Sequence, residues 1–242
     1  MRYVVALVVI LVCWEIFPTV FDVPVFLFPK LSAVVTRIVS DRDVFIYTMG
    51  VTSRAILLSF FVAVALAAVL AYSVHLSRAV RVMFEPLILI SQLIPRVALV
   101  PLVLVWFSYG LQSKVVVAVL ICFFPIYEGL RSGLDLAPRE LILRARLQGY
   151  SRFWSVARLR TPFALPSAFT GLRTGALFSV VGVVVAEFLA SGDGAGIMIV
   201  ERMARGDTPS AFGYMLLVTL VGVVLYGLVI LTELALRTRL RI

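Results

Sequence analysis

Six long apolar stretches alternate with short polar segments along this chain of 242 residues. A helix needs about 20 consecutive apolar residues to cross the hydrocarbon core of a bilayer, and only the first stretch is clearly shorter. We therefore predict an all-α integral membrane protein with about six transmembrane helices, folded as one domain over residues 1–242. The predicted spans are Tyr3–Phe17, Val51–Leu76, Val80–Phe107, Val115–Leu134, Ala164–Leu189 and Ala211–Leu236.

The N-terminal part of the chain is less regular than the rest. Arg2 precedes the first stretch and no small-residue cleavage pattern follows it, so we expect a retained first span or a signal-anchor. The segment Phe21–Tyr47 contains Pro24 and Pro29 and has only a weak amphipathic pattern. We expect it to hold a helix on the membrane surface rather than a span.

The third stretch opens at Glu85-Pro86 and is interrupted at Ile94-Pro95-Arg96 and at Val100-Pro101. Proline removes a backbone donor and bends a helix, and broken helices at membrane depth occur where they line a cavity or are buried in protein. The pattern fits either a pathway-lining element or a kinked structural helix. Gln92 and Arg96 are polar residues in this region, and Arg96 either favours an anionic solute or reaches water at the outer surface.

The fifth stretch combines closely spaced glycines with one acidic residue inside the apolar sequence. Gly171 and Gly175 are spaced so that two helix backbones can approach closely, either within the bundle or between two copies of the chain. Glu187 near its outer end is either a pathway or gate contact or a structural hydrogen-bonding group. Our hypothesis is that Gln92 and Arg96 face Glu187 across a translocation path.

Composition and charge support a membrane location. Hydrophobic residues make up 62 % of the chain and charged residues 14 %, against about 45–50 % and 25 % in soluble domains. The net charge of +9 does not point to a nucleic-acid partner, because arginine and lysine collect on the cytoplasmic side of membrane proteins. With the N-terminus inside, 14 basic residues lie on the cytoplasmic side and 6 outside, which favours both termini in the cytoplasm.

The loop from about residue 131 to 163 carries seven arginines and has a helical pattern of its own. A helix is predicted to begin after Pro138, with Leu141, Ile142, Ala145 and Leu147 on its inner face, and to stop at Gly149. Ser151 can cap a second short helix, Arg152–Arg160, which Thr161-Pro162 should end. A folded basic element between two spans predicts a docking surface for a soluble partner.

This loop resembles the coupling loop of ABC importer permeases. Its Ala145 and Gly149 match the second alanine and the glycine of the family's Glu-Ala-Ala…Gly pattern, while Leu143 and Arg144 replace the glutamate and the first alanine. Glu140, one turn earlier, can substitute for that glutamate. Further motifs resemble the subfamily for nitrate, taurine, alkanesulfonate and pyrimidine-type substrates: Leu27–Val34, Pro86–Leu102, Trp106-Phe107, Ala186-Glu187 and Gly194–Gly196.

The resemblance implies a type I ABC importer permease in a bacterial or archaeal inner membrane, crossing it several times. It implies two cytoplasmic ATPase subunits that hold ATP and Mg, a solute-binding protein outside, and a second permease copy. Membrane lipid is expected around the permease itself. No cofactor is expected in this chain. The expected ATPase-coupling residues are Glu140, Arg144, Ala145, Arg146, Gly149, Tyr150 and Arg152. The expected pathway residues are Gln92, Pro95, Arg96 and Glu187, for a small solute that is anionic if Arg96 selects it.

Two other classes of protein are weighed against this interpretation. A stand-alone secondary transporter would need ion-coupling carboxylates at the membrane midplane, and the sequence has few. A membrane-bound enzyme would need a clustered catalytic set. The sequence has no phosphate-binding loop, nucleophile–base pair or metal-ligand spacing, so ATP hydrolysis is expected in a separate subunit and not in this chain.

Overall fold

The computed structural model describes residues 2–190 and 192–240, in which all regular elements are helices. In chain order they are α1 Arg2–Val20, α2 Leu31–Ser40, α3 Arg42–Leu76, α4 Arg78–Leu93, the 3-10 turn η1 Arg96–Leu99, α5 Val100–Phe107, α6 Leu111–Asp135, α7 Arg139–Leu147, α8 Arg152–Trp154, the π-helical turn η2 Ser155–Arg160, α9 Thr161–Leu189, α10 Ala195–Ala204 and α11 Thr208–Leu240.

Four helices of the described chain are long and apolar enough to cross a membrane: α3, α6, the continuous helix Arg152–Leu189, and α11. The α4 helix and the segment Arg96–Phe107 form a fifth span if the pair, bent by 92°, is counted as one. The membrane-protein fold class is therefore confirmed, with four or five spans in place of about six. The difference is α1, of which Val8–Val20 is among the shorter apolar helices.

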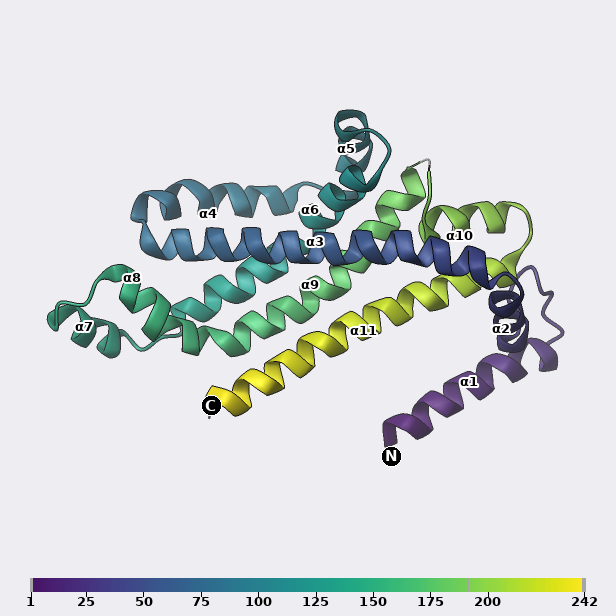
Figure 1. Ribbon diagram of the computed structural model, residues 1–242, viewed down its shortest axis with the longest axis horizontal. Coiled ribbons are helices and arrows are strands. Elements are labelled where there is room, and N and C mark those ends of the chain that lie inside the picture. The colour runs from purple at the N-terminus through teal and green to yellow at the C-terminus, as the bar shows by residue number, and fades with distance from the viewer. Residues whose placement is uncertain (1, 191, 241–242) are drawn as a thin grey trace.

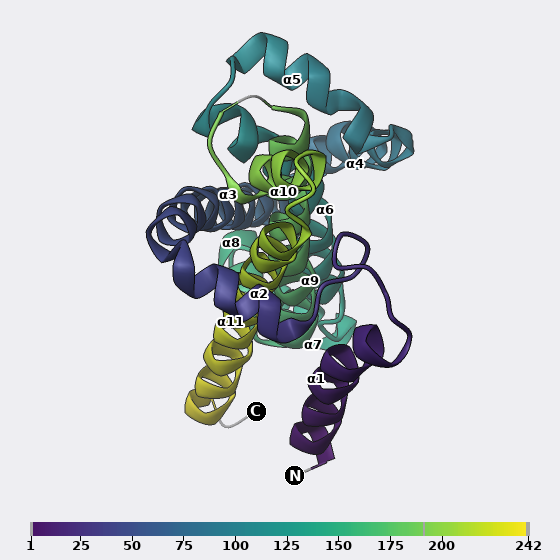
Figure 2. The ribbon, with the colours of Figure 1, turned by 90° about the vertical axis from the view of Figure 1, so that its right-hand side faces the viewer.

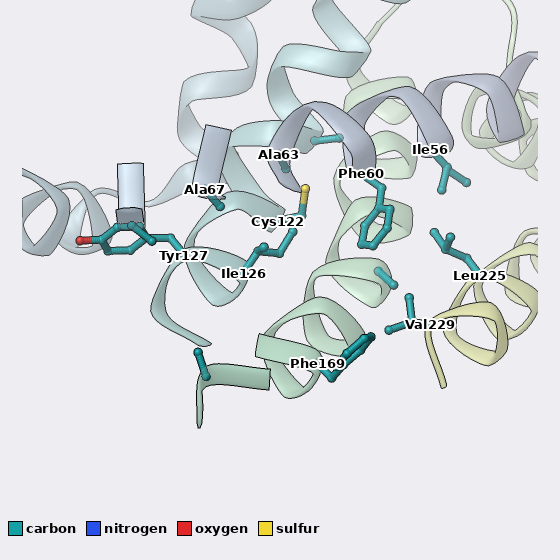
Figure 3. Packing of buried hydrophobic residues seen from close by; sticks show 14 of the residues in the cluster. Ile56, Phe60, Ala63, Ala67, Cys122, Ile126, Tyr127, Phe169, Leu225 and Val229 are labelled. Carbon is teal, nitrogen blue, oxygen red and sulfur yellow. The ribbon is translucent and has the colours of Figure 1, made fainter. Parts of the chain in front are cut away.

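The long helices lie side by side and share one core (Figures 1 and 3). Phe60 of α3, Cys122 and Ile126 of α6, Phe169 of α9 and Leu225 of α11 all belong to this cluster. Burial of such side chains contributes about 1.5–3 kcal/mol each in water. In a bilayer, close packing takes over much of that role, because lipid tails are as apolar as the core.

Small residues bring α6 and α9 into backbone contact. A Cβ atom added at Gly171 would lie 2.5 Å from the carbonyl oxygen of Pro125, and one at Gly182 would lie 2.6 Å from the Cα of Ala118. A Cβ at Gly133 would meet Ala164 at 2.8 Å. Of the two interpretations of the small-residue spacing in the fifth span, packing within the bundle is therefore confirmed.

The two ends of the molecule carry different elements (Figure 1). The turn between α3 and α4 lies at the same end as α7 and α8, whereas α2 and α10 lie at the opposite end. Figure 2 shows α1 standing away from the bundle. Two side chains of α1 hold it to the segment around the start of α2. Trp14 donates to the Pro29 carbonyl at 3.0 Å, and Glu15 accepts from the Ser32 hydroxyl at 2.6 Å.

The α2 helix and the start of α3 differ in part from the predicted surface segment. A short amphipathic helix is present at Leu31–Ser40, but α3 already begins at Arg42 and not near Val51. The reason is the packing of Phe45, which is buried and stacks on Tyr214 of α11 with ring centroids 4.2 Å apart. Contact with α11 thus extends the helix beyond its most apolar stretch.

Asp207 ties α2, α10 and α11 together at this end. Its Oδ2 atom accepts hydrogen bonds from Ser210 at 2.7 Å, Arg202 at 3.2 Å and Arg37 at 3.3 Å. Burial alone would raise the pKa of Asp207, but the hydrogen bonds from Ser210 and Arg37 outweigh it and hold that pKa below its ordinary value. The carboxylate therefore stays charged and acts as the shared acceptor.

Candidate functional site

The arginine-rich loop forms two helices joined by a sharp turn at Gly149. Gly149 has φ +81°, the left-handed conformation that glycine adopts at little cost. The Tyr150 amide donates to the Ala145 carbonyl and the Gly149 amide to the Arg146 carbonyl, both at 3.0 Å. These two bonds form a Schellman motif, which satisfies the last carbonyls of α7. The predicted helix stop is confirmed.

The second half of the loop continues directly into the fifth span. Ser151 caps it as predicted, accepting from the Trp154 amide at 3.1 Å. The prediction that Thr161-Pro162 ends this helix is wrong, because one continuous helix runs from Arg152 to Leu189. The π-helical turn Ser155–Arg160 precedes the proline, and the Thr161 amide bonds to the Val156 carbonyl five residues back. This wider turn accommodates the proline ring and its missing donor.

The outer surface of α7 is apolar as well as basic. Its arginines are exposed as predicted, but Leu143 and Leu147 are also exposed, at 55 % and 79 %. The expectation that Leu141 and Leu147 face inward is therefore wrong, since Ala145 is the buried side chain of this short helix. Glu140 is exposed and lies in the first turn of α7. Next to the turn, Tyr150 and Trp154 stack with ring centroids 4.0 Å apart.

Ionic and hydrogen-bonded contacts fasten the loop to the ends of the spans. Asp135 Oδ1 lies 3.1 Å from His75 Nε2, 3.4 Å from Arg81 Nη2 and 3.7 Å from Arg160 Nη1. Arg152 Nε donates to the His75 carbonyl at 2.8 Å. These contacts connect the loop to α3, α4 and α6, so a displacement of the loop would be transmitted to all three helices.

The broken third span has its break at Ile94 and Pro95, where the backbone becomes extended between α4 and η1. Pro86 lies inside α4, and Pro101 occupies the first turn of α5 where a missing donor is tolerated. The predicted interruption is therefore confirmed at Pro95 and wrong at Pro101, and Pro86 lies within the helix rather than at its opening.

Two neighbouring hollows lie between α4 and α6, and both are lined by Ile88 and Phe124. Gln92 lines one hollow and Arg96 the other. The Arg96 guanidinium lies 5.7 Å from the centre of the Phe124 ring, and its Nη1 donates to the Ile121 carbonyl at 2.9 Å. Pro95 is exposed beside them. The chain therefore presents a half-buried cation and an amide along one groove.

Glu187 lies elsewhere, in a closed polar network in the interior. Its side chain is 0 % exposed, and Oε1 lies 3.1 Å from the ammonium group of Lys114, which is 4 % exposed. Oε1 also accepts from Thr52 Oγ1 at 3.0 Å, and Oε2 accepts from the Gly196 amide at 2.9 Å. Lys114 donates in addition to the Asp193 carbonyl. The network joins α3, α6 and α9 to the start of α10.

The structure does not bring Glu187 and Arg96 together. The hydrogen bonds and the ion pair of Glu187 go to α3, α6 and α10, whereas Arg96 binds the Ile121 carbonyl of α6. Lys114 and Thr52 were not among the residues expected at the site. The sequence signal for Lys114 was its position directly before the apolar stretch that begins at Val115, because a lysine that becomes buried requires an acidic partner.

Comparison with known proteins gives a family. A sequence model of the family described as "Binding-protein-dependent transport system inner membrane component" matches residues 63–242. A probable ABC transporter permease protein of Haemophilus influenzae is 29 % identical over 218 residues, which cover 90 % of this chain and 89 % of that protein.

Several relatives have solutes in their names. The formylaminopyrimidine transport permease protein ThiX of Halalkalibacterium halodurans is 30 % identical over 219 residues, 88 % of this chain and 86 % of that protein. The riboflavin transport system permease protein RibX of Chloroflexus aurantiacus is 41 % identical over 150 residues, 61 % of this chain and 55 % of that protein.

Proposed function

Since this chain belongs to the family of binding-protein-dependent transport system inner membrane components, we propose that two copies of it enclose the pathway of an ATP-driven importer. As a family member it is a multi-pass inner membrane permease for a small solute, works with an ATPase and a binding protein, and is not itself a catalytic ATPase. The proposal adds the stoichiometry: two permease copies, two cytoplasmic ATPase subunits that hold ATP and Mg, and an extracytoplasmic binding protein.

The observation that carries the proposal is the surface of the arginine-rich loop. Leu143 and Leu147 are exposed among arginines at one end of the molecule, where a water-exposed apolar pair is unfavourable without a partner (Figure 1). An interface with an apolar centre and a charged rim is typical of protein docking. The partner we propose is the ATPase. The residues proposed to contact it or to shape the contact are Glu140, Arg144, Ala145, Arg146, Gly149, Tyr150 and Arg152.

The proposed orientation places this loop and both chain termini in the cytoplasm. The α3–α4 turn, with Arg78 and Arg81, lies at the same end as the loop, which is the arrangement that the distribution of basic residues favours. The opposite end, with α2 and α10, then faces the binding protein.

The proposed pathway runs along the groove between α4 and α6. Gln92, Pro95 and Arg96 lie on it, and a half-buried guanidinium there favours a solute with an anionic group. Because two relatives carry riboflavin and formylaminopyrimidine in their names, heterocyclic compounds are the second solute class to assay. Glu187 is proposed to act on the pathway only through its neighbours, since its carboxylate is enclosed.

The experiment is uptake into vesicles that contain the permease and its ATPase, with the solute-loaded binding protein added outside. We expect uptake and ATP hydrolysis that both require the binding protein. Uptake driven by an ion gradient in the absence of ATP would contradict the proposal and favour a secondary transporter. A matched preparation with a hydrolysis-deficient ATPase separates binding from transport.

A further inference from the structure

A cavity of about 480 Å³ lies between the α3–α4 turn and the arginine-rich loop. Five arginines line it: Arg78, Arg81, Arg146, Arg152 and Arg160. They come from three places in the chain, namely the start of α4, the helix α7 and the stretch from α8 through η2. The fold therefore gathers basic side chains that the sequence keeps apart.

The charge of this cavity is only partly balanced by the protein. Asp135 lies within salt-bridge distance of Arg81 and Arg160. Within residues 2–190 and 192–240, neither Arg78 nor Arg146 has an acidic partner at that distance. Like charges held close together repel each other, so an anion with several oxygens would be favoured in their midst.

A second, independent feature of the cavity also points to a ligand. Ser155 lines it with a side-chain hydroxyl that is buried and has no hydrogen-bond partner among the described residues, and Ser155 is only 8 % exposed. A buried hydroxyl without a partner costs about 1–3 kcal/mol, so such groups usually have an occupant to bind. An oxygen-rich anion would accept from this hydroxyl.

An apolar hollow of about 210 Å³ adjoins the basic cavity, and Val156 lines both. The other apolar residues around the hollow are Leu76, Phe153 and Ala157, with Tyr72 beside them. Phe153 is 69 % exposed, so the hollow opens at the surface. A charged cavity and an apolar hollow side by side match a molecule with an anionic head and a hydrocarbon tail.

We propose that this double site binds an anionic phospholipid, with its phosphate among the arginines and an acyl chain along Leu76, Phe153 and Ala157. The inference rests on the proposed orientation, which puts the site at the cytoplasmic membrane surface. The cytoplasmic leaflet contains anionic lipids, and basic pockets between membrane helices bind the head groups of such lipids. A free phosphate would leave the apolar hollow unused, and an acidic side chain of a protein partner would do the same.

A lipid at this position would connect the arginine-rich loop to α4, and so affect how motion of the loop reaches the third span. Arg146 and Tyr150 belong to the loop, whereas Arg78 and Arg81 belong to the start of α4. A phosphate between them joins the loop to the third span. The lipid composition of the membrane would thereby adjust how firmly the loop is held.

The test measures lipid binding to the purified permease by native mass spectrometry. Phosphatidylglycerol is compared with phosphatidylcholine of the same acyl chains and with inorganic phosphate. We expect at least tenfold tighter binding of phosphatidylglycerol, and a loss of roughly 30-fold in the double variant Arg78→Gln/Arg146→Gln, which removes two charges near the membrane. The control is Arg158→Gln, an exposed arginine of the same segment that does not line the cavity, and it should keep wild-type affinity.

A second variant tests the apolar half of the site. Phe153→Ser should weaken phosphatidylglycerol binding and leave the affinity for inorganic phosphate unchanged. Equal binding of both lipids would overturn the proposal, as would an equal loss with Arg158→Gln. Full competition by inorganic phosphate, with no effect of Phe153→Ser, would make this a site for free anions. Weakened ATPase co-purification with unchanged lipid binding would assign the arginines to the protein partner. Because lipid binding is measured without the ATPase, its failure would leave the importer function untouched.

Discussion

The Glu187 carboxylate has Lys114 as its buried counter-charge, so neutralising one side chain leaves the other charge without a partner. We expect Glu187→Gln to lower stability by about 3–5 kcal/mol, as removal of one partner from a buried pair does. The double variant Glu187→Gln/Lys114→Met should regain part of that loss. Melting of the detergent-solubilised protein is the measurement. A variant Glu187→Gln with normal melting but no transport would instead place this carboxylate on the pathway.

Gly149 offers a test of docking at a single position. Its φ is +81° and no atom lies within 4 Å of an added Cβ, so a larger side chain meets open space in the isolated permease. We expect Gly149→Glu to lose the ATPase in co-purification, because the new side chain would occupy the docking surface, while Gly149→Asn, which tolerates this conformation, retains it.

The matched control for this prediction is Gly206, which has φ +75° and equally open surroundings between α10 and α11, at the end of the molecule opposite the loop. Gly206→Glu carries the same backbone strain without changing the loop. Co-purification of the ATPase with the Gly149→Glu variant at the wild-type level would contradict a docking role for the loop.

Arg96 is the residue that should discriminate between solutes. Its guanidinium lines the α4–α6 groove, and a hydrogen bond to a charged group contributes about 1.5–3 kcal/mol. We expect Arg96→Gln to slow uptake of an anionic solute roughly tenfold and to leave a neutral analogue nearly unchanged. Arg54→Gln, an exposed arginine of α3, is the control. Equal slowing of both solutes would indicate a structural role for Arg96.

At the scale of elements, the contact between α6 and α9 depends on glycine. We expect Gly171→Ala to lower stability by about 1–3 kcal/mol, because its Cβ would lie 2.5 Å from the Pro125 carbonyl oxygen and backbone must move. Gly227→Ala in α11 meets no atom within 4 Å and should be neutral or slightly stabilising. Thermal melting of the two variants compares them directly. Equal melting temperatures would show that the two helices separate easily.

Local signals in the sequence predicted local structure well. The stop at Gly149 and the cap at Ser151 depend on hydrogen bonds within a few residues, and both are present. The prediction that the helix ends at Thr161-Pro162 was wrong, because a π-helical turn accommodates the proline. A proline in the sequence does not by itself predict such a turn. The pairing of Glu187 with Lys114 joins residues far apart in sequence, and hydrophobic periodicity carries no information about such a contact.

At the scale of the whole molecule, membrane orientation is the property to be measured. The excess of basic residues at the end with the loop predicts that Leu136 faces the cytoplasm and Asp193 the outside. Both residues are exposed, so single cysteines there are accessible in a background without Cys13 and Cys122. An impermeant reagent added to whole cells should label position 193 and not position 136. The reverse pattern would invert the orientation. Ile242, also expected in the cytoplasm, lies outside the described residues.

The helix α9 makes the end of the bundle next to the proposed docking surface and the far end of the bundle parts of one lever. At 1.5 Å per residue its 29 residues form a rod roughly 44 Å long. A tilt of about 5° where the loop meets α9 would therefore swing the opposite end by roughly 4 Å, most of one helical turn. Glu187 lies near that opposite end, so a small rotation imposed by the loop becomes a large displacement of the carboxylate that accepts from the Gly196 amide of α10.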